Sequence, residues 1–185
     1  MTKTVHQLKA TIVDTKPPVW RRVLVPTEIT LGALHDVVQA AFGWWNCHLH
    51  EFEIDGICYG VDDGEGWKPI EDERRAHLGD VAGEGAAFLY TYDFGDNWDH
   101  KITVEKVLPA LPGARYPTCT AGRRACPPED CGGTYGYRDL LGVIADADHD
   151  EHDSMIEWLG GEFDPDAFDP RDFDARLEIG RIIAP

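Results

Sequence analysis

The chain has 185 residues, of which 34 are Asp or Glu and 17 are Lys or Arg, and its formal net charge is −17 at pH 7. A chain of this length forms one domain with a sizeable core, so it needs no disulfide bonds for stability. The negative charge argues against non-specific binding to nucleic acid or to an anionic membrane surface, because both require clustered Lys and Arg.

The first segments of the chain predict an antiparallel pair of strands and then a helix. Residues 5–13 alternate apolar and polar side chains, as a half-buried strand does, and residues 19–25 predict a second strand after a turn stiffened by two prolines. Thr30 is a suitable N-cap for the next segment, in which apolar residues recur at helical spacing until Gly43.

Two hairpins are expected next. Residues 47–60 read as two strand halves around an Asp-Gly pair, which is a strong signal for a tight turn. Residues 86–93 and 99–107 predict a second pair of strands joined by a short Gly-Asp-Asn turn. Strand pairs joined by tight turns indicate a mainly antiparallel sheet.

The second half of the chain begins with a stiff loop. Residues 108–133 contain five Pro, four Gly and three Cys and are predicted to be irregular. Three helices are expected after it, at residues 135–146, 150–160 and 169–183.

This order of elements predicts an α+β fold: a mainly antiparallel sheet with one packed helix, a long loop rich in Cys, Pro and Gly, and a C-terminal helical cluster. We expect a single domain over residues 1–185. Its parts are a β-rich half (1–107), the loop (108–134) and an acidic helical half (135–185).

Seven short motifs, spread in order over nearly the whole chain, resemble those of one protein family. They read PPVWRR, LHDVVQAAFGW, HLHEF, YDFGDNWDH, CTAGRRACPPEDCGG, GYRDLL and FDPDAFD. By these motifs the chain is similar to the plasmid pRiA4b ORF-3-like proteins of bacteria and archaea, some of which are described as insertion-element passenger proteins. The resemblance implies a compact α+β unit and a gene context of plasmids and mobile elements, and it implies no catalytic residue.

Cys119, Cys126 and Cys131 follow the spacing Cys-x6-Cys-x4-Cys. Zinc prefers thiolate and imidazole ligands, and a structural site usually contains two cysteines separated by roughly two to four residues, which only the second gap satisfies. The alternative is a stiff loop whose small thiols pack inward. A disulfide bond ranks below both, because the expected compartment keeps thiols reduced.

The motif HLHEF offers histidines that would complete such a zinc site. In a strand, His48 and His50 would share one face with Phe52 and Ile54. Two histidines one pleat apart can chelate a metal, and His100 is a third candidate ligand. The apolar neighbours favour the alternative, in which the imidazoles are buried, neutral and hydrogen-bonded. Zinc is the one cofactor that the sequence suggests.

The second hairpin carries a cluster of acidic residues. Asp93, Asp96 and Asp99 surround its turn together with His100, and such groups can hold a divalent ion for hydrolysis of phosphate esters. Asp is also an ordinary turn residue, because its side chain bonds to nearby backbone. Trp98 is expected to pack across the hairpin, so the turn interpretation is favoured.

Basic residues gather in two places, on the second strand and inside the cysteine loop. If the fold brings them together, they form a positive patch for a phosphate or a carboxylate. The alternative is that they pair with Glu129, Asp130 or the acidic helices. The candidate binding residues are Arg21, Arg22, Trp98, Asp93 and Asp96.

The acidic groups are concentrated near the C-terminus. Residues 146–178 carry 13 Asp or Glu against Arg171 and Arg176, a net charge of −11. Such a region is either a solvated face or a docking surface for a basic protein partner. No apolar run is long enough to span a membrane and the N-terminus lacks a signal core, so a cytoplasmic location is expected.

Together these features predict a non-catalytic binding or accessory module linked to plasmids or mobile elements. The alternative is a metal-dependent hydrolase that uses Cys, His and Asp ligands to hold zinc or another divalent ion.

Overall fold

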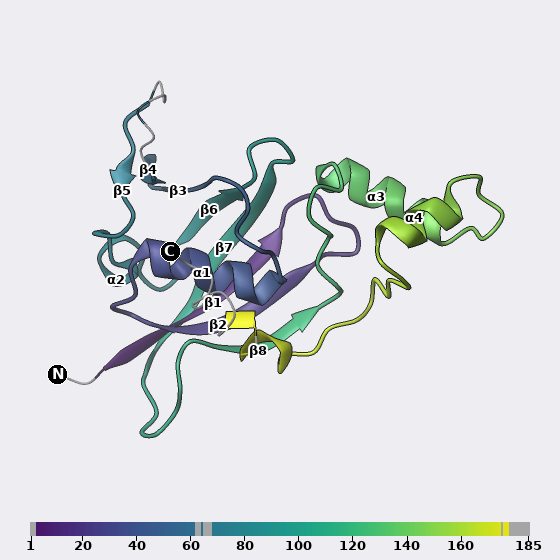
Figure 1. Ribbon diagram of the computed structural model, residues 1–185. Helices are drawn as coiled ribbons and strands as arrows, with labels where there is room; N and C mark the ends of the chain where they lie inside the picture. The colour runs from purple at the N-terminus through teal and green to yellow at the C-terminus, as the bar shows by residue number, and fades with distance from the viewer. Residues whose placement is uncertain (1–2, 62–63, 65–67, 175, 178–185) are drawn as a thin grey trace.

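An eight-stranded sheet forms the centre of the computed structural model, which describes residues 3–61, 64, 68–174, 176 and 177 (Figure 1). The strand order is β5-β4-β3-β6-β7-β1-β2-β8, and every pair is antiparallel except β4 with β5. The strands are β1 (Thr4–Ile12), β2 (Trp20–Pro26), β3 (His50–Ile54), β4 (Ile57–Gly60), β5 (Glu71–Asp72), β6 (Ala87–Tyr92), β7 (Trp98–Pro109) and β8 (Thr118–Arg123). The helices are α1 (Leu31–Phe42), α2 (Leu78–Val81), α3 (Gly133–Ile144) and α4 (His152–Trp158).

The predicted first strand pair is confirmed and lies inside the sheet. β1 pairs with β2 on one side and with β7 on the other, so it is a central strand. The alternating pattern places Leu8, Ala10 and Ile12 on the buried face, where each is at most 4% exposed. This face supplies much of the apolar core.

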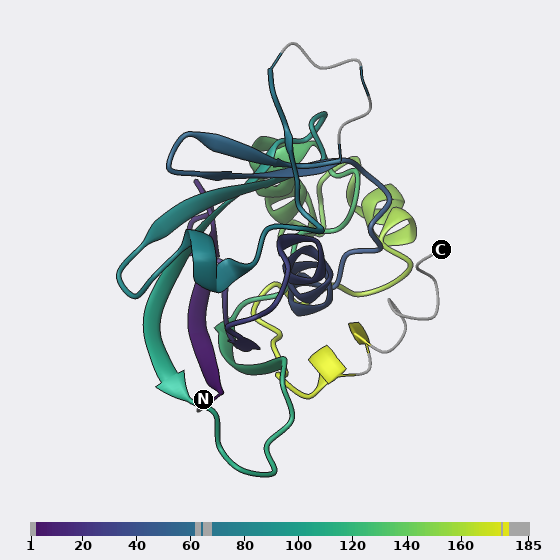
Figure 2. The ribbon, with the colours of Figure 1, turned by 90° about the vertical axis from the view of Figure 1, so that its left-hand side faces the viewer.

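The predicted helix is also confirmed, and it packs on the concave face of the sheet (Figure 2). Thr30 caps α1 by accepting a hydrogen bond from the backbone N–H of Ala33 at 3.2 Å. Gly43 ends the helix in the left-handed conformation, with φ at 86°, and its N–H donates to the Gln39 carbonyl. Leu34 and Phe42, each at most 1% exposed, face the sheet side of the helix.

Both predicted hairpins are present, as β3 with β4 and as β6 with β7. Asp55 and Gly56 form the first turn with positive φ angles of 50° and 79°. The mainly antiparallel α+β architecture that the sequence predicts is therefore confirmed.

The loop prediction for residues 108–133 is wrong for part of its length. Thr118–Arg123 form β8, an edge strand that pairs with β2. This segment, TCTAGR, has no clear apolar alternation, and its partner strand β2 is distant in the sequence, so pairing with β2 rather than local preference makes it a strand. The short elements β5 and α2 were not predicted for a similar reason.

The C-terminal helices lie beyond one end of the sheet (Figure 1). α3 and α4 contact each other, and α3 begins beside the turn between β6 and β7, where the Gly132 N–H donates to Asp96 Oδ2 at 3.0 Å. The helix predicted for residues 169–183 lies partly outside the described residues, and residues 172–174 and 176–177 are helical. None of the helices in the described part of the chain is long and apolar enough to cross a lipid bilayer.

Candidate metal centre

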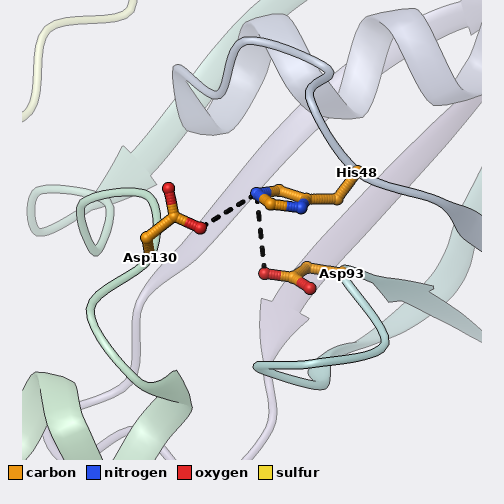
Figure 3. A group of neighbouring side chains, drawn as sticks. All are labelled: His48, Asp93 and Asp130. Carbon is orange, nitrogen blue, oxygen red and sulfur yellow. Dashed lines mark ion pairs between the residues drawn. The ribbon is translucent and has the colours of Figure 1, made fainter.

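Three side chains from distant parts of the chain converge beside the turn between β6 and β7 (Figure 3). His48 lies between α1 and β3, Asp93 follows β6, and Asp130 lies in the loop before α3. One ligand atom from each residue lies within 4.8 Å of the other two. Among the described His, Cys, Asp and Glu side chains, these three form the group whose ligand atoms are spaced closely enough to hold a metal ion.

The Nε2 atom of His48 is the centre of the cluster. It lies 3.1 Å from Asp130 Oδ1 and 3.7 Å from Asp93 Oδ2. The atom is buried, and among the described residues it makes no hydrogen bond, because none of the nearby oxygens lies in suitable geometry. The imidazole packs edge-on against the Tyr92 ring, with ring centroids 5.7 Å apart. Its contacts with the carboxylates are ion pairs of the protonated imidazole and not hydrogen bonds (Figure 3), so a metal ion could replace the proton on this nitrogen.

Asp93 is fixed by the turn that it begins. It has a left-handed backbone with φ at 57°, which Asp tolerates better than most residues. Its N–H donates to the Leu49 carbonyl at 2.9 Å, which ties the turn to the segment that carries His48. Its Oδ1 accepts from the Gly95 N–H at 2.9 Å, so Oδ2 is the oxygen left to face the imidazole.

Glu129 adds a third carboxylate at the edge of the cluster. Its Oε2 lies 3.9 Å from His48 Nε2, and its Oε1 accepts from the Trp45 N–H at 2.8 Å. The Tyr92 hydroxyl donates to the same carboxylate, at 3.2 Å from Oε1. Burial raises the pKa of the Glu129 carboxyl above its usual value, and the nearby His48 opposes that rise. Glu129 is thus a half-buried carboxyl whose proton affinity is increased.

The loop that carries both acids is held against the rest of the protein on either side of them. The Trp44 indole N–H donates to the Pro127 carbonyl at 3.0 Å in the buried interior. On the far side, Gly133 passes so close to the turn that a Cβ there would lie 2.4 Å from the Asp96 carbonyl oxygen. Only glycine fits this approach, because the φ of Gly133 is also positive at 66°. These contacts fix the position of Asp130 relative to Asp93.

The charge balance of the cluster favours a cation. Three carboxylates surround one imidazole, and among the described residues none of them forms an ion pair with Lys or Arg. Carboxylates held this close repel one another, and a divalent ion would neutralise most of that repulsion. One imidazole with two or three carboxylates suits Mn²⁺, Fe²⁺ or Zn²⁺. Metal–ligand distances are about 2.0–2.2 Å, so the ligand atoms would move closer together on binding.

The other two candidate histidines lie elsewhere. His50 Nε2 pairs with Glu73 Oε2 at 2.8 Å, and its ring stacks on His35 with centroids 3.4 Å apart. His100 is completely buried, and its Nδ1 lies 2.8 Å from the Trp98 carbonyl oxygen. The structure therefore brings His48 alone of the three to the cluster. His48 also precedes β3, so it does not share a strand face with His50 as the sequence predicted.

The three loop cysteines pack inward, as in the alternative interpretation of the sequence. All five cysteines of the chain are free thiols. Burial raises the pKa of Cys119, Cys126 and Cys131, to about 12 for Cys131, so the reactive thiolate forms are disfavoured. Within the described residues, none of them joins a group with metal-binding spacing.

The remaining candidate binding residues do not form one patch. Arg22 makes an ion pair with Glu105 through two hydrogen bonds of 2.6 and 2.8 Å. Arg21 is buried and donates to backbone carbonyls, Trp98 is fully buried, and Asp96 binds the Gly132 N–H. Only Asp93 of this set lies in the cluster around His48.

Sequence reasoning missed the two acidic residues of the loop as ligands. Glu129 and Asp130 lie between two cysteines, in the segment PPED, and were considered only as ion-pair partners for arginine. The feature of the sequence that could have indicated them as ligands is an acidic pair that directly follows two prolines, which restrict the backbone of the loop.

Comparison with known proteins places this chain in a family. A family model described as "Plasmid pRiA4b ORF-3-like protein" matches residues 4–172. Uncharacterized protein y4hQ of Sinorhizobium fredii is 43% identical over 162 residues, which are 86% of this chain and 83% of that protein. The crystal structure of the protein of unknown function MM3350 from Methanosarcina mazei superposes with a TM-score of 0.87 at 42% identity, covering 93% of this chain and 97% of that one. The chain belongs to the plasmid pRiA4b ORF-3-like family.

Proposed function

We propose that this protein is a metal-dependent hydrolase whose divalent ion is held by His48, Asp93 and Asp130. The observation that carries the proposal is the buried Nε2 of His48, which makes no hydrogen bond and lies within 3.9 Å of three carboxylates that no Lys or Arg neutralises in the described part of the chain. Such an arrangement has unfavourable electrostatics without a cation and favourable electrostatics with one.

Two features favour a catalytic ion over a structural one. A structural metal is usually enclosed by four protein ligands, whereas three ligands leave positions for water. Asp130 is 70% exposed, so one side of the cluster is open to solvent. A water molecule on the ion would be acidified and would serve as the nucleophile. Glu129, with its raised pKa, is placed to exchange a proton with that water.

The charge of the site also indicates the kind of bond that is cleaved. Three carboxylates around one divalent ion leave a net negative charge, and the whole chain carries −17. A phosphodiester polymer or a phosphomonoester would be repelled. The preferred substrate is therefore an uncharged carboxylic ester or amide.

Metal content tests the first part of this proposal. Protein purified without an affinity tag or chelator should contain about one equivalent of a divalent transition metal by mass spectrometry. His48→Ala and Asp93→Asn should lose it, whereas His152→Ala, which removes a surface histidine paired with Asp153, should retain it. A wild-type content below about a tenth of an equivalent, after incubation with Mn²⁺ or Zn²⁺ and desalting, would refute the site.

Turnover tests the second part. The metal-loaded protein should hydrolyse p-nitrophenyl butyrate or N-acetyl-L-leucine p-nitroanilide, both uncharged, faster than p-nitrophenyl phosphate, and EDTA should abolish the reaction. The rate should fall with Asp93→Asn and stay unchanged with His152→Ala. A loaded protein that hydrolyses no ester or amide in a broad panel would leave metal binding standing and would refute hydrolysis.

A second candidate function follows from the acidic C-terminal segment. Residues 146–151 are exposed and rich in Asp and Glu, which is the surface expected for docking a basic protein. A non-catalytic module of this kind, and its link to plasmids, stays a prediction. Replacing Asp148 and Asp150 by Asn and Glu151 by Gln should weaken a salt-sensitive interaction with a basic partner, and partner capture unchanged by this replacement would contradict it.

A further inference from the structure

A pocket of about 820 Å³ lies on the other side of the loop that carries Glu129. It is bounded by the end of α1, by residues 125–129 and by the C-terminal segment from Trp158 to Arg176. Its volume is within the usual range for small-molecule sites. Glu129 lines this pocket and also borders the candidate metal centre, so the two sites are neighbours separated by one side chain.

Arg21 is a buried cation in the wall of this pocket. The residue is 2% exposed, and its guanidinium donates from Nε to the Ala41 carbonyl at 2.8 Å. Nη1 donates to the carbonyls of Trp20 and Arg123 at 2.9 and 3.1 Å. In the described part of the chain Nη2 makes no hydrogen bond, and no carboxylate pairs with the guanidinium. A buried charge without a counter-ion is costly, so this group favours an anion in the pocket.

The guanidinium of Arg21 is also held in a fixed orientation. It lies over the rings of Phe42 and Phe168, at 5.1 and 4.6 Å from their centroids. Stacking between two rings together with three backbone acceptors leaves it little freedom. The N–H groups of Nη2 are therefore presented in one direction, as in a preorganised anion site.

Arg176 supplies a second cation to the same pocket. Its side chain lies against Gly43, where a Cβ would be 2.8 Å from Nη1 and 2.9 Å from Cζ. Burial lowers the pKa of Arg21, and the charge of Arg176 acts in the same direction. Its one ion pair among the described residues is a long contact of 3.9 Å with Asp172. The positive charges of Arg21 and Arg176 repel each other across this pocket, and an anion bound between them would offset that repulsion.

The acidic residues of the pocket wall do not supply that anion. Asp169 is engaged by Arg171 through several hydrogen bonds, and Asp172 faces Arg176 at 3.9 Å. The Glu129 carboxylate accepts hydrogen bonds from the Trp45 N–H and the Tyr92 hydroxyl. None of the three forms an ion pair with Arg21.

The rest of the lining is aromatic. Trp44 and Phe163 form part of the wall, and Trp45 and Trp158, which also line the pocket, are 64% and 52% exposed. Large aromatic side chains exposed beside a pocket commonly mark a binding surface. They offer flat apolar faces on which a planar ring of the ligand would stack.

We propose that this pocket binds a small aromatic carboxylate, with the carboxylate between Arg21 and Arg176 and the ring against the tryptophans. Arg21 presents the free N–H groups of Nη2, and Arg176 completes a bidentate or bridged contact. The ligand enters beside Trp45 and Trp158. The site requires no metal ion and stands whether or not the neighbouring cluster is a hydrolase centre.

Isothermal titration calorimetry with 2-naphthoate tests this inference, with the neutral alcohol 2-naphthylmethanol as the matched probe. The EDTA-treated wild-type protein should bind one equivalent of 2-naphthoate, and the alcohol at least roughly tenfold more weakly. Arg176→Gln should weaken 2-naphthoate binding roughly tenfold or more and leave binding of the alcohol unchanged. Arg138→Gln, on the exposed surface of α3, is the control and should bind like the wild type.

Trp158→Ala is a second variant, since it removes an exposed ring without changing the charge. It should weaken both probes. The inference is overturned if 2-naphthoate shows no saturable binding at millimolar concentrations. It is overturned equally if the alcohol binds as tightly as the acid, or if Arg176→Gln, folded by circular dichroism, binds 2-naphthoate like the wild type.

Discussion

His100 makes the folded protein sensitive to acid. Its imidazole is fully buried, edge-on to the rings of Phe42 and Trp44, with ring centroids 4.8 and 5.2 Å away. Nδ1 lies 2.8 Å from the Trp98 carbonyl, so it carries the proton, and Nε2 has no partner among the described residues. The Tyr90 ring also packs against it, with centroids 5.3 Å apart, and the Tyr90 hydroxyl stays neutral because burial raises its pKa well above the usual value. The surroundings therefore exclude the imidazolium.

The size of the effect follows from the pKa difference. Burial lowers the pKa of His100 from 6.5 to about 4. Between these values the unfolded chain binds a proton that the folded protein does not, so stability is fully present above pH 6.5 and is lost as the pH falls towards 4. One pKa unit corresponds to about 1.4 kcal/mol, so at pH 5 His100 alone lowers the free energy of unfolding by about 2 kcal/mol relative to pH 8.

Urea unfolding at pH 8 and pH 5, with EDTA present, measures this loss. His100→Leu has nearly the volume of histidine and cannot titrate, so its loss of stability between the two pH values should be smaller than that of the wild type by about 2 kcal/mol. The substitution also removes the donor to the Trp98 carbonyl, but that cost is the same at both pH values and cancels. His152→Leu is the control, at a histidine of α4 that lies away from the core and is 22% exposed, and it should lose as much as the wild type.

A His100→Leu protein that loses as much stability as the wild type on acidification would refute the reasoning. If the variant does not fold, the imidazole can be followed directly in the wild type by NMR. Carbon and nitrogen shifts of the His100 ring should stay those of the neutral form down to pH 5, and titration near pH 6.5 would contradict the argument in the same way.

Three further substitutions test the loop between the two candidate sites. Gly133→Ala places a Cβ 2.4 Å from the Asp96 carbonyl oxygen at a positive φ, so it should lower the free energy of unfolding by about 1–3 kcal/mol in urea titrations. Gly142→Ala, which has open space inside α3, is its control and should raise stability by about 1 kcal/mol. Glu129→Gln removes a negative charge from both sites, so calorimetry should show weaker binding of Mn²⁺ and tighter binding of 2-naphthoate. If the two affinities both rise or both fall, Glu129 does not border both sites. Trp44→Phe removes the N–H bound to the Pro127 carbonyl, so it should cost about 1–2 kcal/mol and weaken Mn²⁺ binding, and unchanged metal affinity would show that this contact does not position the acids.

The parts of the fold that could be predicted are those specified by local chemistry. Thr30 and Gly43 define α1 through capping and a left-handed backbone, and the Asp-Gly pair defines a hairpin turn. β8 could not be found in this way. Its residues become a strand because β2 offers an unpaired edge, and that information is distributed over two segments far apart in the sequence.

The candidate site shows the same division. His48 and Asp93 were singled out from the sequence, but each was grouped with its neighbours in the chain, His50 and the other acids of the turn. In the structure those neighbours serve the fold: His50 pairs with Glu73, and Asp96 binds the loop. Ligands at positions 48, 93 and 130 have no diagnostic spacing, because sheet pairing and loop docking bring them together.

The rigidity of the loop is the physical reason to treat the cluster as a binding site. A carboxylate as exposed as Asp130 can turn into water and escape the repulsion of Asp93 and Glu129. Instead its Oδ1 lies 3.1 Å from His48 Nε2, and the loop beside it is held by the bonds from Trp44 and Trp45. A loop that only docked helices onto the sheet would be more stable with neutral residues at these positions, because the repulsion would be absent. Stiff geometry that keeps like charges together is what the proposed cation site requires, and it gives the acidic pair behind the prolines a role in that proposal.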